Sequence, residues 1–414
     1  MKPIKIGIMG SGRGSTIAKN LMLLNCEITA VCENNPDRLK YAYKNIGPDV
    51  PVYQDFDKFL DSGIDAVVIA NSFHEHAPYA IKCFEKNIHV FCECISNSTM
   101  AEGVELIRAY EKSNSIYFLA ENYPQMLFNR EMKRVCDGKT LGKILFAEGE
   151  YNHPVDPFDN EFKKEYNYQF KHWRNYLPAS YYITHSLGPV MHITGASPKR
   201  VCAMAAFCPE TRENIPVSKQ TADKSAIIIT TNDDGSVFRI TGCSQYGAHS
   251  NSYRICGTKG QIENIRGMGN KVMLRYNSWD KPEGAFETMM YEPAIKDKDD
   301  AIIKKSGHGG GDYLTARMFV DCIRQNKQPE HPFDIYSAVT MSSVAILAHR
   351  SILQGGMPFD IPDFKDENER IKYQNDTLSP FYYEDGTKPS IPCCSHPDYK
   401  PLDSQLEAYK KCLR

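Results

Sequence analysis

The feature that most constrains this chain is an apolar strand pattern that runs directly into a glycine-rich loop. Residues 3–9 alternate apolar positions and are followed at once by Gly10 and Gly12. A helical pattern over residues 16–24 comes next, and a second strand pattern over residues 28–32 ends at Glu33. Strand, glycine turn, helix and strand in this order predict a βαβ unit of a parallel sheet, the unit that binds dinucleotides.

Each position of the loop has a physical role in that interpretation. Gly10 permits the tight turn, Gly12 lets the backbone approach a pyrophosphate, and the helix N-terminus offers free N–H groups. Glu33 lies 21 residues after Gly12, where a carboxylate accepts a ribose 2′-hydroxyl and repels a 2′-phosphate. We therefore expect NAD rather than NADP, contacted by these three residues and Arg13. Ser15 stands where the fingerprint has its third glycine.

Further strand patterns at residues 65–70, 89–92 and 115–119 alternate with helical patterns, which predicts a Rossmann-type parallel sheet. In an open parallel sheet the ligand lies in the crevice at the carboxyl ends of the strands. The residues that follow these strand ends are the other expected cofactor contacts: Asn71, Phe73, His76, Glu93, Cys94 and Asn122. For Cys94 a buried small apolar side chain fits the pattern equally well.

After residue 123 the pattern changes from alternation to strands in succession, from 144–151 to 271–276, with two helical patterns behind them. Such an order predicts an antiparallel meander, within an α+β domain that has a large, mainly antiparallel sheet. The fold class is therefore α/β with a second α+β domain. We expect a Rossmann domain over 1–123, a substrate-binding and catalytic domain over 124–362, and a polar, Pro-rich extension over 363–414.

Composition excludes several classes of protein. A formal net charge of -2 argues against a nucleic-acid binder. The longest apolar run, residues 201–208, is too short for a membrane span. The 14 cysteines include no Cys-x-x-Cys pair, which indicates reduced thiols and no structural zinc. Because Met1 leads directly into a strand pattern, we expect no signal peptide and a cytoplasmic location.

Three stretches resemble the Gfo/Idh/MocA oxidoreductases: 65–70 (DAVVIA), 86–93 (KNIHVFCE) and 257–260 (GTKG). The resemblance covers residues 3 to 362 and includes the order of the two domains. Two departures stand out. Typical dehydrogenases of the family read Glu-Lys-Pro where this chain has Glu93-Cys94-Ile95, so their catalytic lysine is missing. Their Asp-x-Gly-x-His motif is also absent.

In place of that motif the chain reads YITHSLGP over 182–189. This stretch is similar to the Tyr-x-Thr-His-x-Leu-Gly-Pro of glycoside hydrolase family 109, the NAD-dependent α-N-acetylgalactosaminidases. The other stretches that resemble motifs of this subgroup are 120–122 (AEN), 148–151 (EGEY), 173–174 (WR) and 307–312 (GHGGGD).

The resemblance implies glycoside hydrolysis by transient oxidation. The sugar is oxidised at C3 by NAD, the acidified C2 proton is removed, the C1 substituent leaves, water adds, and C3 is reduced again. Tyr182 and His185 are implied as catalytic residues, with Tyr182 also touching the cofactor. Tyr151, Arg174 and His308 are implied to bind the sugar. A spacing of three predicts that Tyr182 and His185 share one face of a helix start.

Other interpretations remain open at this stage. A net NAD-dependent dehydrogenase or 3-oxidase of a sugar, glycoside or cyclitol would use the same cofactor residues, and a non-enzymatic NAD-linked sugar sensor fits the missing lysine. Tyr182 and His185 could simply pack, and His308 could cap a helix. We expect a small-molecule carbohydrate as the partner, no metal, and a homo-oligomer, either dimer or tetramer.

Overall fold

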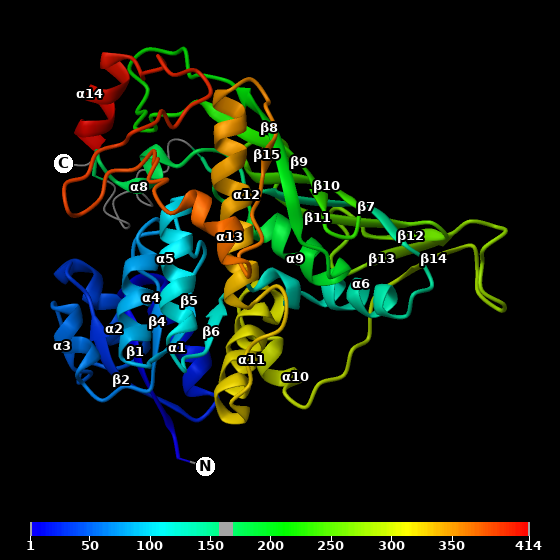
Figure 1. The fold of residues 1–414 in the computed structure, drawn as a ribbon, viewed down its shortest axis with the longest axis horizontal. Helices are drawn as coiled ribbons and strands as arrows, with labels where there is room; N and C mark the ends of the chain where they lie inside the picture. The colour runs from blue at the N-terminus through cyan, green and yellow to red at the C-terminus, as the bar shows by residue number, and fades with distance from the viewer. Residues whose placement is uncertain (1, 157–168, 413–414) are drawn as a thin grey trace.

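The structure, a computed structural model, describes residues 2–156 and 169–412 and contains two sheets with helices around them (Figure 1). The strands are β1 (Ile4–Met9), β2 (Cys26–Cys32), β3 (Val52–Tyr53), β4 (Ala66–Ile69), β5 (His89–Cys92), β6 (Tyr117–Leu119), β7 (Ile144–Asn152), β8 (Pro198–Phe207), β9 (Asp223–Asn232), β10 (Val237–Ser244), β11 (Ser250–Gly257), β12 (Gly260–Asn264), β13 (Val272–Tyr276), β14 (Thr288–Tyr291) and β15 (Phe359–Asp360). The longer helices are α1 (Ser11–Met22), α4 (His76–Glu85), α5 (Met100–Glu111), α6 (Leu127–Asp137), α9 (Thr184–Thr194), α11 (Gly311–Gln325), α12 (Ile335–Leu353) and α14 (Asp403–Cys412). The short ones are η1 (Pro36–Arg38), α2 (Leu39–Asn45), α3 (Phe56–Leu60), η2 (Tyr123–Gln125), α8 (Trp173–Tyr176), α10 (Asp300–Ile303), η3 (His308–Gly310), α13 (Glu367–Arg370) and η4 (Ile371–Tyr373).

The first sheet has the order β3-β2-β1-β4-β5-β6, and every pair in it is parallel. Its central strands are continuous apolar runs; all four residues of β4 are buried. Strands covered on both faces have this composition because neither face meets water. The predicted Rossmann sheet is therefore confirmed.

The second sheet has nine strands in the order β14-β13-β12-β11-β7-β10-β9-β8-β15. Seven of its eight pairs are antiparallel, which confirms a large, mainly antiparallel sheet. The exception is β7, which lies parallel to β10. A simple meander of successive strands was therefore wrong at this position, because β7 inserts between two strands that come later in the chain.

One core cluster joins the two sheets and includes α12, whereas α11 packs on the parallel sheet. Phe319 of α11 packs on Phe91 of the parallel sheet, with ring centroids 4.9 Å apart. Phe333, just before α12, stacks on Phe118 at 5.1 Å. Figure 1 shows α12 standing between the two sheets, and α9 lying against the inner face of the second sheet. The face of the parallel sheet is thus covered in part by helices from the second half of the chain.

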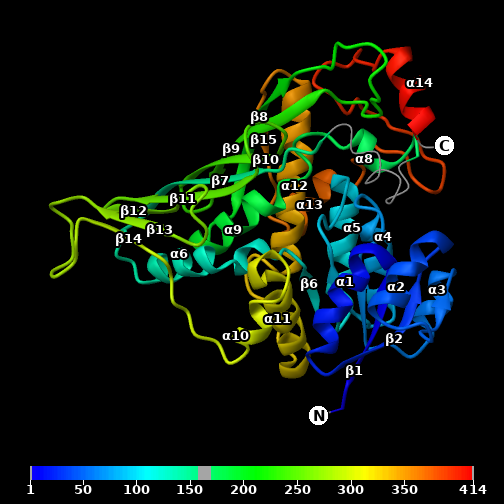
Figure 2. The same ribbon diagram turned by 180° about the vertical axis from the view of Figure 1, so that it is seen from behind.

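The C-terminal residues run back across the end of the parallel sheet, where α14 and the short α8 lie (Figure 2). We keep the division into 1–123, 124–362 and 363–414 as a proposal, because the parallel sheet ends with β6 and the second sheet with β15. In the described parts of the chain, no helix combines the length and apolarity that crossing a membrane requires.

Candidate active site

The glycine loop forms the first turn of α1. The helix begins at Ser11, five residues earlier than the pattern predicted, so the loop and the helix N-terminus are one feature. Gly10 has φ 84°, and a Cβ built there would lie 2.3 Å from the carbonyl oxygen of Ala70. A Cβ on Gly14 would lie 2.7 Å from Cγ2 of Ile8. Gly14, rather than position 15, therefore allows the close approach of helix and strand.

Glu33 is held in place at the carboxyl end of β2. Its carboxylate accepts hydrogen bonds from the Ser11 N–H at 2.9 Å, the Ser11 hydroxyl at 2.7 Å and the Asn35 N–H at 3.0 Å. Two carboxylate oxygens offer about four lone-pair positions, so acceptor capacity remains for a ribose hydroxyl. The guanidinium of Arg38 lies against Gly12, with Nη2 2.4 Å from a Cβ built there. It brings a positive charge to the loop that is expected to hold a pyrophosphate.

A cavity of about 380 Å³ opens at the carboxyl ends of β1, β2 and β4. Its lining includes Gly10, Glu33, Arg38 and Asn71 from the parallel sheet. The Oδ1 atom of Asn71 is buried without a hydrogen-bond partner. A buried polar atom of this kind is costly unless a ligand or water satisfies it. The cavity, the glycine turn and the unsatisfied amide together fit the adenosine half of a dinucleotide.

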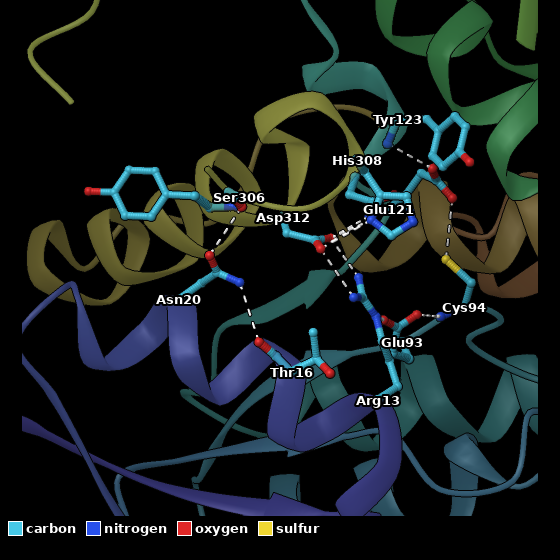
Figure 3. Close-up of polar contacts among 12 residues, drawn as sticks. Arg13, Thr16, Asn20, Glu93, Cys94, Glu121, Tyr123, Ser306, His308 and Asp312 are labelled. Carbon is cyan, nitrogen blue, oxygen red and sulfur yellow. Dashed lines mark hydrogen bonds and ion pairs between the residues drawn. The ribbon is translucent and has the colours of Figure 1, made fainter. Parts of the chain in front are cut away.

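Asp312, in the first turn of α11, joins three of the expected site residues (Figure 3). Its carboxylate accepts hydrogen bonds from Arg13 Nη2 at 2.6 Å and Asn122 Nδ2 at 2.6 Å, and lies 3.1 Å from His308 Nδ1. Arg13 also donates to Glu93 at 2.8 Å. Burial opposes ionisation, but these donors lower the pKa of Asp312 far below its ordinary value. The Oδ1 atom of Asn122 stays buried without a partner, which again leaves a polar atom for the cofactor.

Tyr182 and His185 lie in a chain of hydrogen bonds that ends on Glu121. The Tyr182 hydroxyl is 3.1 Å from His185 Nε2, and His185 Nδ1 is 2.8 and 2.9 Å from the two oxygens of Glu121. Tyr182 precedes α9 by two residues, so the prediction that both lie on the helix was wrong. The predicted proximity of the two side chains is nevertheless observed.

The protonation of this chain follows from its surroundings. Burial raises the pKa of the Glu121 carboxyl, but the charge of His185 and its hydrogen bond outweigh burial, and the pKa lies below its ordinary value. An ionised carboxylate only accepts, so His185 Nδ1 is assigned a proton whether or not Nε2 carries one. When Nε2 carries no proton, it accepts from the Tyr182 hydroxyl. Burial raises the pKa of Tyr182 well above its ordinary value, while the charge of Arg174 lowers it in part.

Aromatic rings enclose the imidazole. Tyr123 stacks on His185, with centroids 4.0 Å apart and planes 15° apart. Tyr151 meets His185 edge-on at 5.0 Å and Tyr182 at 5.9 Å. These rings fix the plane of the imidazole and exclude water from its faces. They also place Tyr151, an expected sugar contact, beside both catalytic candidates.

A second aromatic group connects the site with the cofactor crevice. Phe73 meets Tyr182 edge-on at 5.8 Å and stacks on Trp173 at 5.1 Å. Trp173 in turn lies under the guanidinium of Arg174 at 4.4 Å. The expected cofactor contact Phe73 and the expected sugar contact Arg174 thus both pack on one indole ring.

The remaining expected residues fall on the boundary between cofactor crevice and catalytic chain. Cys94 is buried, and its Sγ lies 3.4 Å from Glu121 Oε2. Burial, with the nearby carboxylates, raises the pKa of this thiol well above its ordinary value, so it is a neutral donor. His76 is buried with Nδ1 2.7 Å from the carbonyl oxygen of Ile95. His308 is 39 % exposed and lies 5.7 Å from the Tyr123 ring, at the rim of the site.

Sequence reasoning missed three residues of this site. Glu121 was part of a quoted motif, but no role was assigned to it; its position directly after a buried strand was the available signal. Asp312 closed another quoted motif, GHGGGD, and no role was assigned to it. Arg38 gave no signal, because a single arginine after an acidic strand end is typical of exposed loops. In the described ranges, no cluster of three or more His, Cys, Asp or Glu side chains has the arrangement of a metal site.

Comparisons with known proteins point to one family. Residues 4–121 match the model of the oxidoreductase family with an NAD-binding Rossmann fold, and residues 131–370 match the C-terminal domain of glycosyl hydrolase 109. An alpha-N-acetylgalactosaminidase of Tannerella forsythia is 25 % identical, over 87 % of this chain and 86 % of that protein. A glycosyl hydrolase family 109 protein of Stenotrophomonas maltophilia is 24 % identical, over 88 % and 89 % of the two chains. A levoglucosan dehydrogenase in complex with NADH and levoglucosan has the same fold, with a TM-score of 0.70 at 18 % identity, over 87 % of this chain and all of the other.

Proposed function

This chain belongs to glycosyl hydrolase family 109, with an NAD-binding Rossmann domain at its N-terminus, and on that premise we propose that it is a redox-neutral, NAD-dependent glycosidase. Membership makes it an NAD-dependent enzyme, either a glycosidase or a sugar dehydrogenase. The proposed reaction oxidises a sugar at C3, removes the C2 proton, eliminates the C1 substituent, adds water and reduces C3 again. The observation that carries the proposal is the buried chain Tyr182–His185–Glu121 beside the cofactor crevice.

The three side chains form a proton relay. His185 Nε2 can accept the phenol proton of Tyr182 while the Tyr182 oxygen takes a proton from a sugar hydroxyl. The resulting imidazolium is stabilised by the ionised Glu121, whose two oxygens lie within 2.9 Å of Nδ1. Hydrolases with a catalytic triad place a hydroxyl group, a histidine and an orienting carboxylate in the same order. Here the phenol of Tyr182 takes the place of the hydroxyl group. The relay runs in both directions, so it can also return a proton to a leaving oxygen.

Bound NAD supplies a hydride acceptor and donor at the sugar ring carbon. The residues expected to hold it are Arg13, Asn71 and Asn122, the last two with a buried unsatisfied oxygen each. Cys94 occupies the position at which typical dehydrogenases of the family carry a lysine. Its neutral, buried thiol cannot act as an ammonium acid, which leaves proton transfer to the Tyr182 relay.

The sugar is expected to lie between the relay and the rim. Tyr151 offers an aromatic edge, Arg174 a planar fork of donors for hydroxyls, and His308 a ring at the opening. Trp173 holds the Arg174 guanidinium over its face, which fixes the direction of the fork. These roles remain proposals that a sugar-bound structure would test.

Incubation with aryl glycosides in deuterated water tests the proposal. Phenol release with deuterium at C2 and no net NADH is the expected result. NADH formed in proportion to substrate, without phenol release, would show a net dehydrogenase and contradict the proposal. Ligand binding without either product would contradict both enzymatic interpretations.

A further inference from the structure

The cavity at the adenosine end of the cofactor site has a wall that comes from the C-terminal extension. Its lining includes Gly10, Glu33 and their neighbours at the strand ends. The other lining residues include Tyr382, Tyr383 and Glu384, together with residues 169 and 171–173. The matched family domain ends at residue 370, so Tyr382, Tyr383 and Glu384 lie outside the match, whereas residues 169 and 171–173 lie within it.

The wall is attached to the Rossmann domain by specific hydrogen bonds. His74 Nε2 lies 2.8 Å from the carbonyl oxygen of Tyr382, and the Glu384 N–H donates to Glu75 Oε1 at 3.0 Å. The Tyr383 hydroxyl lies 2.8 Å from the hydroxyl of Ser98. All three Rossmann partners follow β4 or β5 at their carboxyl ends, which is the edge where the dinucleotide binds.

Ring packing supports the same attachment. The His74 ring packs against Phe381 at 4.7 Å and against Tyr383 at 4.9 Å. Phe381 is fully buried and His74 is 4 % exposed. On the other flank the Tyr382 ring meets Tyr176 edge-on at 5.1 Å and lies under the Lys171 ammonium at 5.3 Å. The segment 381–384 is thus packed between two parts of the molecule and lines the cavity from a defined position.

We propose that residues 381–384 form a strap over the adenosine half of the bound NAD and slow its dissociation. The strap closes the side of the cavity that an open Rossmann crevice leaves to solvent. Release of the nucleotide then requires the strap to detach from His74, Glu75 and Ser98. A ligand enclosed on this side leaves slowly, because its dissociation is limited by the opening of the wall.

The proposal concerns NAD binding and does not depend on hydrolysis. Slow dissociation of NAD nevertheless affects which reaction the enzyme can carry out. A net dehydrogenase must exchange its cofactor in every turnover, whereas an enzyme that returns the hydride to the same sugar needs no exchange. A strap that retains NAD is compatible with the second mode of action and would limit the rate of the first.

The test is a chase of labelled NAD from the full-length protein. Tyr382→Ala removes the ring that lines the cavity, and Tyr399→Ala is its matched control, a half-buried tyrosine of the same extension that packs on Phe207 away from the cavity. We expect NAD to dissociate about tenfold faster from Tyr382→Ala, equivalent to the loss of one good aromatic contact, and at the wild-type rate from Tyr399→Ala. Equal rates in wild type and Tyr382→Ala would overturn the proposal.

A second measurement locates the effect. ADP-ribose carries the adenosine half of NAD, and nicotinamide mononucleotide carries the other half. Tyr382→Ala should weaken binding of ADP-ribose and leave that of nicotinamide mononucleotide unchanged, measured by the fluorescence of Trp173 in a Trp279→Phe background. Equal weakening of both would overturn the proposal. If Tyr382→Ala does not fold, Tyr383→Phe serves instead, since it keeps the ring and removes only the hydrogen bonds to Ser98 and Ser379.

Discussion

The Nδ1 atom of His185 lies 2.8 Å from an oxygen of Glu121, a carboxylate that is fully buried at the end of the last strand of the parallel sheet. The two residues are 64 positions apart in the chain. The contact joins the Rossmann domain, which carries the carboxylate, to the second domain, which carries the imidazole. The proposed proton relay therefore depends on how the two domains pack.

Glu121→Gln tests that relationship. The amide keeps the shape of the side chain but loses the charge, so it stabilises neither the imidazolium nor the Nδ1–H tautomer. We expect kcat to fall about 10²–10⁴-fold, as for other histidines that lose their carboxylate. The pH profile of kcat should also change, while NAD content stays at the wild-type level. Glu131→Gln is the control, because Glu131 is also buried but pairs with Arg134 in α6. An unchanged kcat in Glu121→Gln would contradict the relay.

Tyr182→Phe separates the phenol from the ring. The ring packs on Phe73 and Tyr151 and should hold its place, so NAD should remain bound. Loss of the hydroxyl removes a proton carrier, and we expect kcat to fall about 10²–10⁴-fold. Steady-state kinetics measures kcat, and the ratio of absorbance at the nucleotide and protein wavelengths measures the amount of bound NAD. A variant that loses its NAD but keeps kcat on addition of free NAD would place Tyr182 in cofactor binding alone.

Asp312→Ala tests the attachment of α11 to the Rossmann domain. Removal of the carboxylate leaves the Arg13 guanidinium and the Asn122 amide without their shared acceptor. We expect a loss of about 3 kcal/mol in the free energy of unfolding, measured in urea. Asp57→Ala breaks only an exposed pair with Lys82 and should cost less than about 1 kcal/mol. Similar losses in the two variants would show that Asp312 does not join the domains.

The strap should respond to pH through two opposing groups. Burial raises the pKa of Glu75 to about 7, although the hydrogen bond from the Glu384 N–H of the strap lowers it in part, so the buried state favours protonated Glu75 and weakens as pH rises from 4.5 towards 7. Burial lowers the pKa of His74 to about 4, although the hydrogen bond to the Tyr382 carbonyl raises it in part, so the buried state favours neutral imidazole and weakens as pH falls below 6.5. Between pH 4.5 and 6.5 the two effects oppose each other. The other titratable groups that interact with Glu75 and His74 are Glu384, Glu102, Tyr79, Tyr383, His76 and His172.

Glu75→Gln should therefore reveal the effect of His74. In this variant the dissociation rate of NAD is expected to rise as pH falls below 6.5, while in the wild type it changes little over the same range. The chase of labelled NAD across this range measures it. A pH profile of Glu75→Gln that matches the wild type would show that these two groups do not control docking.

The parallel sheet could be predicted because its determinants are local. The alternation of residues 4–9, the glycine turn at Gly10 and the acidic end of β2 at Glu33 lie within 33 residues, and each acts through the backbone. The start of α1 was misjudged because glycines in a first helical turn have low helix propensity, which hides the helix in the sequence. The parallel insertion of β7 beside β10 joins strands that are 85 residues apart at their closest ends, and no local pattern encodes it.

Part of the site could also be predicted, because the positions of some of its residues are determined locally in the sequence. Residues after strand ends, such as Asn71 and Asn122, follow from the topology of the sheet alone. The partners that set their chemistry do not: Asp312 meets Arg13 across 299 positions, and Tyr382 meets His74 across 308. Such contacts depend on how the two domains and the extension pack. The catalytic role of Tyr182 and His185 was implied by the family resemblance. Their spacing of three residues predicted only that the two side chains lie close together.

Turnover of an aryl glycoside labelled with deuterium at C3, in ordinary water, tests whether the enzyme returns the hydride to the sugar from which it came. If the relay serves a redox-neutral cycle, the sugar released from this substrate keeps its deuterium at C3. In a parallel experiment with a substrate deuterated at C2, the released sugar carries a solvent proton at C2. His185→Ala, with NAD still bound, should show no exchange at C2. Loss of the C3 label to free reduced cofactor, or full exchange at C2 in His185→Ala, would contradict the account.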